Sequence, residues 1–396
     1  MRDRGIFYCT GFLRSLGVGT TGVLLGIYLL KLEFGAPQVG LVIAAGLAGV
    51  SGGTLAVSLL ADRWGRKRTL IGISLMALAG GALVAAGGGF WTILLGAFCG
   101  MMSGGGDRGA AYSLEQAVLP ATVPDGKRTL VYATYGVVAD VGLALGALLA
   151  GLPYVLREHM AAGELASYRA AMALYPLAGL ASAFLYAFLS PAVEGGRGTG
   201  LGGVSPAGRK TIARLSALFS LDSFGGGFIP AALLSYWFFR QFGAEEAALG
   251  PLFAAGHFMN AASYFAAVWL ARRIGLVNTM VFTHIPSSFL LLLLPFVPSF
   301  PAAVGVYLLR EFLVQMDVPT RQSYIVAIVE PGERTAVTGI TNLVRGMTRA
   351  AAPAIAGHVM GLLALSAPLF ICAGLKVSYD LLLYGAFRRV KPPEER

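Results

Sequence analysis

Long apolar stretches recur along the whole chain, and this repetition constrains the fold more than any other feature. Twelve stretches, each long enough to cross a bilayer as a helix of roughly 20 residues, are separated by short polar segments. Only 13% of the 396 residues are charged, whereas a soluble protein has about 25%. So few charges cannot cover a protein surface in water. The sequence therefore excludes an ordinary soluble enzyme and predicts an all-α membrane protein.

The apolar stretches define the expected transmembrane helices. Apolar and polar residues do not alternate as they would in an outer-membrane barrel, so we expect helices only. The three cysteines have neither disulfide nor metal-site spacing, and we expect no cofactor and no metal. The predicted spans are residues 6–31, 37–60, 69–88, 91–118, 130–156, 168–190, 211–238, 247–270, 276–296, 301–328, 336–360 and 366–387.

Basic residues predict the orientation of these spans. With the N-terminus inside, the cytoplasmic segments contain eighteen Lys and Arg residues and the outer loops contain four. The positive-inside rule then places both termini in the cytoplasm. Arg14 interrupts the first apolar stretch, so we expect a retained span and not a cleaved signal peptide. We expect a multi-pass protein of the inner or plasma membrane, and the net charge of +10 requires no nucleic-acid partner.

A polar segment at residues 191–210, rich in Gly, Ser and Pro, divides the chain at its midpoint. We expect a flexible cytoplasmic linker there, between a six-helix bundle at 1–190 and a second at 211–396. Short matches relate the two halves: residues 61–65 align with 271–275, and Asp107 aligns with Asp317 at the same offset of 210. The architecture expected is thus twelve transmembrane helices in two pseudo-symmetric six-helix halves.

One loop resembles a family signature. The segment from Leu60 to Arg68, LADRWGRKR, lies between the second and third spans. It is similar to the signature loop of the major facilitator superfamily, in which Asp, a basic residue, Gly and further basic residues follow an upstream Gly. The residues 271–275 then correspond to a degraded second copy, so the resemblance covers the whole chain. It implies secondary transport by rocking alternation around a site near the midplane.

The same resemblance implies a conformational latch in this loop. Asp62 would meet the N-terminus of the eleventh span, where a carboxylate is stabilised by the helix dipole. The remaining signature positions, Arg63, Gly65, Arg66 and Lys67, would complete the latch across the cytoplasmic face. The simpler alternative is that the basic residues only set the orientation. The Gly-Pro pair of the family's span-5 antiporter motif is absent, which leaves the direction of transport open.

Ionisable residues inside the predicted spans are the candidate functional residues. A charge at the centre of a membrane helix costs at least about 2.5–3.5 kcal/mol, so these charges must pair with each other or with a ligand. At about 1.5 Å per residue, a set of them lies about 12–16 Å from the cytoplasmic helix ends, in one layer. That set is Arg14, Arg108, Asp140, Asp222, Asp317 and Arg345.

Repeat positions suggest how the layer is arranged. Arg14 and Asp222 occupy matching positions of the two halves, and we hypothesise that they face each other across a central cavity. Arg345 and Arg349 share a helix face, so an anionic substrate could contact them together with Arg14. The alternative is a structural lattice of ion pairs with Asp107, Asp140, Glu311 and Asp317.

Two further groups complete the candidate residues. Arg310, Asp317 and Arg321 are spaced to share one face of the tenth span. Asp222 is the preferred candidate to carry a coupling proton, followed by Asp140 and Asp107. Lys376 and Asp380, four residues apart, are expected to form a local pair away from the cavity, and His284 to be a hydrogen-bonded interior residue.

These patterns favour proton-coupled efflux of a small organic solute by a monomeric transporter in the lipid bilayer. Uptake or exchange of an organic anion is the alternative within the same class. A transporter-like receptor without turnover is the alternative outside it. No ATP-binding loop or nucleophile motif occurs in the sequence, so neither a pump driven by ATP nor an enzyme is expected.

Overall fold

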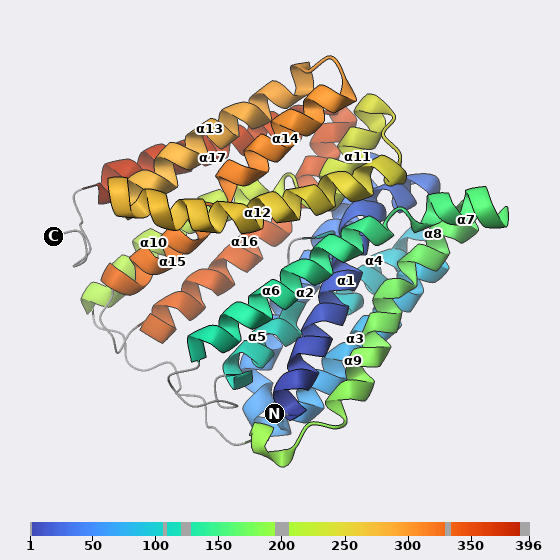
Figure 1. Cartoon of the computed structure of the whole chain (residues 1–396), viewed down its shortest axis with the longest axis horizontal. Coiled ribbons are helices and arrows are strands. Elements are labelled where there is room, and N and C mark those ends of the chain that lie inside the picture. The colour runs from blue at the N-terminus through green and yellow to red at the C-terminus, as the bar shows by residue number, and fades with distance from the viewer. Residues whose placement is uncertain (1, 106–108, 120–127, 195–205, 329–333, 389–396) are drawn as a thin grey trace. The chain divides into compact units, whose positions relative to one another are not determined.

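The computed structural model describes residues 2–105, 109–119, 128–194, 206–328 and 334–388, and these residues form helices and connecting turns without any strand (Figure 1). The all-α prediction is confirmed for this part of the chain. The chain divides into two compact units. Unit 1 comprises residues 1–198, 230–254 and 353–361, and unit 2 comprises residues 199–229, 255–352 and 362–396.

The helices of each unit follow the apolar stretches. Unit 1 contains α1 (Arg2–Lys31), α2 (Ala36–Trp64), α3 (Arg66–Ala86), α4 (Phe90–Gly100), α5 (Gly109–Val118), α6 (Arg128–Leu149), α7 (Leu152–Met160), α8 (Glu164–Met172), α9 (Leu174–Tyr186), η3 (Pro191–Glu194) and α11 (Ala231–Phe242). Unit 2 contains α10 (Pro206–Gly227), α13 (Leu276–Leu293), η4 (Leu294–Phe296), α14 (Phe300–Val314), α15 (Asp317–Ile328) and α17 (Ala367–Phe387). Two long helices, α12 (Glu246–Ile274) and α16 (Arg334–Leu362), contribute to both units.

Seven helical stretches of the described residues are long and apolar enough to cross a membrane. Their bounds are 2–31, 36–61, 66–86, 134–160, 213–242, 276–296 and 367–387. The other predicted spans are covered by shorter or more polar helices, so the count of twelve spans stays a prediction.

Prolines divide four of the predicted spans, which the sequence suggested were continuous helices. Pro319 lacks the N–H that would bond to the carbonyl of Gln315, and its ring clashes with that carbonyl. Helix α14 accordingly ends at Val314, and α15 begins at Asp317. The same relation separates α6 from α7, α8 from α9 and α10 from α11, at Pro153, Pro176 and Pro230.

Glycines divide the fourth span, which we predicted as one helix over 91–118. Helix α4 ends at Gly100, and the chain leaves the helical path through Gly104 and Gly105, which have φ angles of 68° and 98°. A Cβ on Gly105 would lie 3.0 Å from the Cα of Gly22 on α1. Only glycine combines this φ with such a close approach, so Gly104 and Gly105 permit the break that begins at Met101, which has φ of 55°.

The same turn occurs at equivalent positions of the two halves. Gly65 joins α2 to α3 with φ of 94°, and Gly275 joins α12 to α13 with φ of 86°. In both turns the hydroxyl of a threonine four residues later, Thr69 or Thr279, donates to the glycine carbonyl at 2.8 Å. Residues that are 210 positions apart in the sequence therefore form the same local turn in the two halves.

Small residues bring α1 and α6 together in unit 1. A Cβ on Gly146 would lie 2.1 Å from the carbonyl oxygen of Leu16, and a Cβ on Gly19 would lie 2.3 Å from that of Leu143. The hydroxyl of Thr20 donates to the carbonyl of Gly146 at 2.9 Å. Such close backbone approach is typical of helix packing in membranes, and it places the polar residues of α1 next to those of α6.

Candidate functional site

A buried polar cluster lies among four helices of unit 1. Its centre is Glu115 on α5, which is fully buried. Arg14 on α1 forms an ion pair with this carboxylate, and Tyr135 on α6 and Tyr186 on α9 donate hydrogen bonds to it. Thr10, one turn before Arg14, donates a further bond at 2.6 Å. One carboxylate thus joins α1, α5, α6 and α9.

Arg14 also donates hydrogen bonds to the same tyrosines. The terminal nitrogen that pairs with Glu115 donates to the Tyr135 hydroxyl at 2.8 Å, and the other terminal nitrogen donates to the Tyr186 hydroxyl at 3.3 Å. The Nε atom of Arg14 is buried and has no hydrogen-bond partner among the described residues. Because Arg14 and Glu115 neutralise each other, the cluster carries no net charge.

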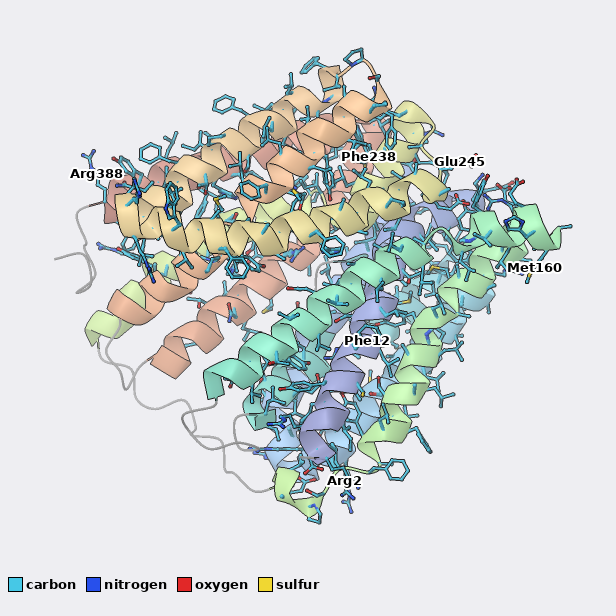
Figure 2. The ribbon with its side chains drawn as sticks, viewed as in Figure 1. Arg2, Phe12, Met160, Phe238, Glu245 and Arg388 are labelled. Atoms are coloured by element: carbon cyan, nitrogen blue, oxygen red, sulfur yellow. The ribbon has the colours of Figure 1, made fainter. Side chains whose placement is uncertain are left out.

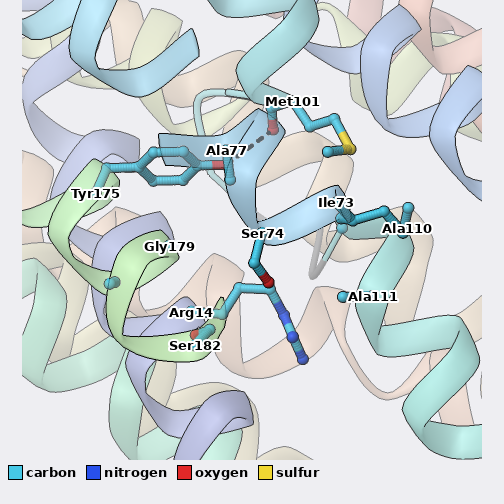
Figure 3. Close-up of a pocket in the computed structure, with 12 residues that line it drawn as sticks. Arg14, Ile73, Ser74, Ala77, Met101, Ala110, Ala111, Tyr175, Gly179 and Ser182 are labelled. Carbon is cyan, nitrogen blue, oxygen red and sulfur yellow. Dashed lines mark hydrogen bonds between the residues drawn. The ribbon is translucent and has the colours of Figure 1, made fainter. Parts of the chain in front are cut away.

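A pocket opens beside this cluster (Figure 3). Arg14, Ser74 and Ser182 line it with polar atoms, and Met101 and Tyr175 lie at another side. Its volume is about 40 Å³, and one water molecule needs roughly 10–15 Å³. The pocket can therefore hold a few waters, but it is too small for an organic solute in this conformation.

A second and larger polar network lies in unit 2, centred on Asp222 of α10. Three cationic side chains approach its carboxylate: Lys376 of α17 at 2.9 Å, Arg321 of α15 at 3.4 Å and Arg345 of α16 at 3.5 Å. Arg321 also pairs with Asp317 on its own helix. The charge of Asp222 is therefore more than compensated by its neighbours.

The network continues from Lys376 to α13. Nζ of Lys376 lies 3.1 Å from Nε2 of His284, and Nδ1 of His284 lies 2.9 Å from Oδ1 of Asp380. Asp380 is fully buried and His284 is 1% exposed. Five helices, α10, α13, α15, α16 and α17, thus contribute to one network with three carboxylates and three permanent cations, so its charges balance.

Arg14 and Asp222 each have a countercharge within their own unit, and the hypothesis that they face each other across a central cavity stays a prediction. Two other sequence-based expectations are corrected by these contacts. Lys376 and Asp380 are not an isolated local pair, because each contacts His284. The break between α14 and α15 separates Arg310 from Asp317, so they do not share one continuous helix face. Arg310 pairs instead with the adjacent Glu311.

The remaining predicted site residues either lie at partly buried positions or fall outside the described residues. Asp140 on α6 and Arg349 on α16 are both partly buried, and both interact with neighbours. Asp107, Arg108 and the side chain of Asp62 lie outside the described residues. The structure therefore brings together Asp222, Asp317 and Arg345 of the predicted layer, and it places Arg14 in a separate cluster.

The signature loop is joined to η3, the short helix that follows α9. The carboxylate of Glu194 accepts hydrogen bonds from the backbone N–H groups of Arg66 and Lys67, at 2.7 and 3.1 Å. These are the first free N–H groups of α3, where a negative charge is favourable. The side chain of Lys67 donates to the carbonyl of Leu189 at 3.1 Å, and Arg63 is exposed. The loop is thus held by the chain that follows α9.

For several important residues the sequence did not indicate the contacts that the structure shows. Glu115 and Arg321 were recognisable as charges within apolar spans, but the spacing did not indicate their partners. Tyr135 and Tyr186 carried no signal at all, because 15 tyrosines occur along the chain. His284 was expected to be hydrogen-bonded in the interior, and only the structure connects it to Lys376 and Asp380.

Charged residues also meet at the opposite end of unit 1 from Arg2, where Figure 2 shows Met160 and Glu245. Glu246, which is 1% exposed, pairs with Arg157 of α7 and accepts a hydrogen bond from Tyr168 of α8 at 2.8 Å. This cluster ties the start of α12 to α7 and α8.

Comparison with known proteins identifies the family. The family model described as Major Facilitator Superfamily matches residues 7–309. The chain therefore belongs to the Major Facilitator Superfamily, and the resemblance seen in the signature loop is confirmed. Membership defines a membrane transporter fold, and it indicates a transporter and not an enzyme.

Individual proteins similar to the chain agree with this assignment. The uncharacterized membrane protein YJR124C of Saccharomyces cerevisiae is 26% identical over 431 residues, covering 98% of this chain and 94% of that protein. The nucleoside transporter NupG has a TM-score of 0.74 at 15% identity, covering 98% of this chain and all of that chain.

Two further solved structures share the fold. A D-xylose-proton symporter has a TM-score of 0.75 at 11% identity, covering 99% of this chain and 98% of that one. The human organic anion transporter MFSD10 has a TM-score of 0.61 at 19% identity, covering 96% of this chain and 99% of that one. At these identities the similarity demonstrates the fold alone.

Proposed function

We propose that this chain is a secondary transporter that moves a small organic solute across the inner or plasma membrane by alternating access, coupled to protons and in the direction of efflux. The observation that carries the proposal is the pair of buried, charge-balanced networks around Glu115 and Asp222. Buried ion pairs contribute little stability compared with apolar packing. Such networks in the spans of a transporter family therefore favour a role in binding solute and protons.

Uptake or exchange of an organic anion is the second candidate. It is favoured by Arg345, whose side chain is 26% exposed and whose Nε donates to Ser223 at 2.8 Å. A partly exposed guanidinium can exchange a protein contact for a carboxylate or phosphate of the solute. Arg14 and Arg349 are the further residues that we propose to contact such a solute, with Arg108, Asp107, Asp140 and Arg310 in supporting positions.

The signature loop is proposed to act as the conformational latch of this cycle. Asp62, Arg63, Gly65, Arg66 and Lys67 would bind the cytoplasmic end of the eleventh span in one conformation only. A contact made in one state biases the equilibrium by its own free energy. We further propose that the protein works as a monomer with both termini in the cytoplasm.

Transport by the purified full-length protein in liposomes tests these proposals. The panel contains organic acids, organic cations, nucleosides, hexoses and dipeptides, each with and without a pH gradient. Efflux coupling predicts that at least one solute moves against its gradient only when protons flow the opposite way, and that an uncoupler abolishes the movement. Parallel movement of an organic acid and protons would favour anion uptake. Failure of the entire panel, at every gradient, would favour a receptor without turnover.

Neutralisation of Arg345 separates the two solute classes. A hydrogen bond to a charged group contributes about 1.5–3 kcal/mol, so Arg345→Gln should weaken the apparent affinity for an anionic solute by roughly tenfold or more. The matched control is Arg273→Gln, which removes an exposed cation at the end of α12 and should leave transport unchanged. Equal effects of the two substitutions would contradict a direct role for Arg345.

A further inference from the structure

Asp380 differs from the other carboxylates of the unit 2 network because, among the described residues, neither Lys nor Arg lies within ion-pair distance of it. Asp222 has three cations within 3.5 Å, and Asp317 pairs with Arg321. Both carboxylate oxygens of Asp380 instead contact one nitrogen, Nδ1 of His284, at 2.9 and 3.0 Å. A buried carboxylate that lacks a countercharge is costly when ionised. Among these three groups, Asp380 gains most from binding a proton.

The position of Lys376 determines which atom of the His284–Asp380 pair can accept that proton. An ammonium group donates hydrogen bonds and accepts none, so the Nε2 atom that it contacts at 3.1 Å carries a lone pair. Nδ1 of His284 then carries the hydrogen and donates it to Asp380. A second proton on His284 would have to bind Nε2, directly against the ammonium. An added proton therefore binds the carboxylate and not the imidazole.

We propose that Asp380 is the site of the coupling proton, an inference that rests on the second candidate function above, the proton-coupled uptake of an organic anion. In this step one O–H bond forms on Asp380, its negative charge is lost, and no other group changes its protonation state. His284 keeps its Nδ1–H and donates it to the remaining carbonyl oxygen. Asp222 stays ionised because its three cationic neighbours stabilise the carboxylate.

Protonation of Asp380 also changes the charge available to a solute. The charged groups of the network are Asp222 of α10, Asp317 and Arg321 of α15, Arg345 of α16, and Lys376 and Asp380 of α17, with neutral His284 between them. The nearby pair Arg310–Glu311 of α14 is neutral as a whole. Loss of the Asp380 charge leaves three cations against two carboxylates. The excess positive charge favours an acidic group at Arg345, the most exposed cation of the set, so the proton and an anionic solute should bind together.

Infrared difference spectroscopy of the full-length protein in lipid nanodiscs tests the proton site without any solute. Lowering the pH should produce the carbonyl stretching band of a protonated carboxylic acid. Asp380→Asn, which has nearly the same shape as a protonated aspartic acid, should lose that band. Glu164→Gln, which changes a half-exposed carboxylate of unit 1 outside both networks, should keep it. A band that persists in Asp380→Asn, or that disappears in Glu164→Gln alone, would overturn the assignment.

Nitrogen NMR of the histidines provides a second measurement that needs no aspartate variant. The chain has four histidines, and loss of one signal in His284→Gln assigns His284. We expect this residue to stay neutral, with hydrogen on Nδ1, through the pH range in which the infrared band appears. Formation of an imidazolium at His284 in that range would overturn the proposal even if Asp380→Asn failed to fold.

The outcomes separate the proton site from the transport function. If the band is assigned to Asp380 but no solute of the liposome panel moves, the proposed transport fails and the proton site stands. If transport is driven by protons but the band survives in Asp380→Asn, the function stands and the assignment fails. If the transport and the proton site are both confirmed, Asp380→Asn should abolish the pH dependence of anion transport, a loss that Glu164→Gln should not reproduce.

Discussion

At the scale of single residues, the polar cluster of unit 1 depends on a charge whose countercharge lies on another helix. Glu115 is fully buried and accepts bonds from Arg14, Tyr135, Tyr186 and Thr10. Each of these donors satisfies a lone pair that would otherwise be buried without a partner. Removing the carboxylate leaves the guanidinium without its countercharge and leaves two tyrosine hydroxyls without their acceptor.

Glu115→Gln should therefore lower the free energy of unfolding by about 3–5 kcal/mol, the usual cost of breaking one side of a buried ion pair. Replacing both partners, Arg14→Met with Glu115→Leu, should cost less than Glu115→Gln alone. Chemical unfolding in detergent measures both effects. The control is Glu164→Gln, which removes the half-exposed partner of Lys31 and should cost at most about 1 kcal/mol. Equal losses for Glu115→Gln and Glu164→Gln would contradict this account.

At the scale of helices, the turns at Gly65 and Gly275 determine where one helix ends and the next begins. Gly65 combines φ of 94° with ψ of 134°, a region that residues with a side chain avoid. A Cβ at this position would also lie 3.1 Å from Oε1 of Glu194, the carboxylate that binds the first N–H groups of α3. Backbone conformation and helix capping therefore both require glycine here.

Gly65→Ala should destabilise the protein by about 1–3 kcal/mol because alanine is strained in this conformation. Gly72→Ala is the matched control on the same helix, because a Cβ there meets nothing within 4 Å. It should be neutral or stabilising by up to about 1 kcal/mol, since alanine favours helix more than glycine does. Thermal unfolding of both variants in detergent measures the difference. A harmless Gly65→Ala would refute the strain argument.

The sequence predicted most of the helices but not their interruptions. Apolar length predicted where helices occur, because a membrane helix must satisfy its backbone hydrogen bonds internally. The breaks at Pro319 and at Gly104–Gly105 depend on whether neighbouring groups can satisfy the freed backbone. Pro251, Pro286 and Pro353 lie inside continuous helices, so proline alone did not indicate a break. Which prolines and glycines interrupt a helix is determined by packing in the folded protein.

At the scale of the whole molecule, parts of α11 and α16 pack against α1 and α2 within unit 1. A Cβ on Gly26 would lie 2.2 Å from the carbonyl oxygen of Ala232, and a Cβ on Gly40 would lie 2.3 Å from that of Pro353. The hydroxyl of Ser235 donates to the carbonyl of Val23 at 2.7 Å. The predicted topology places these contacts toward the outer side of the membrane, where the alternating access that we propose would require them to break.

Gly26→Leu should therefore favour the conformation in which α1 and α11 separate. The measurement is the labelling rate of a cysteine at Ser235→Cys by a membrane-impermeant maleimide, after replacement of Cys9, Cys99 and Cys372. A shift of about 1.4 kcal/mol changes a population tenfold, so we expect labelling to accelerate by roughly that factor. Gly136→Leu, where a Cβ meets nothing within 4 Å, should leave the rate unchanged. Identical rates in both variants would mean that this contact does not open.

The sequence by itself determined the membrane environment, the helical class and the family. These properties follow from local features: apolar length, sparse charge and the signature loop around Asp62 and Gly65. It also predicted the depth of each buried charge, because a helix rises by a constant amount per residue. It did not give the partners, since depth does not say which neighbouring helix a side chain faces. Only the tertiary structure paired Arg14 with Glu115 and connected Asp222 through Lys376 and His284 to Asp380, because a buried charge takes the countercharge that packing brings within reach.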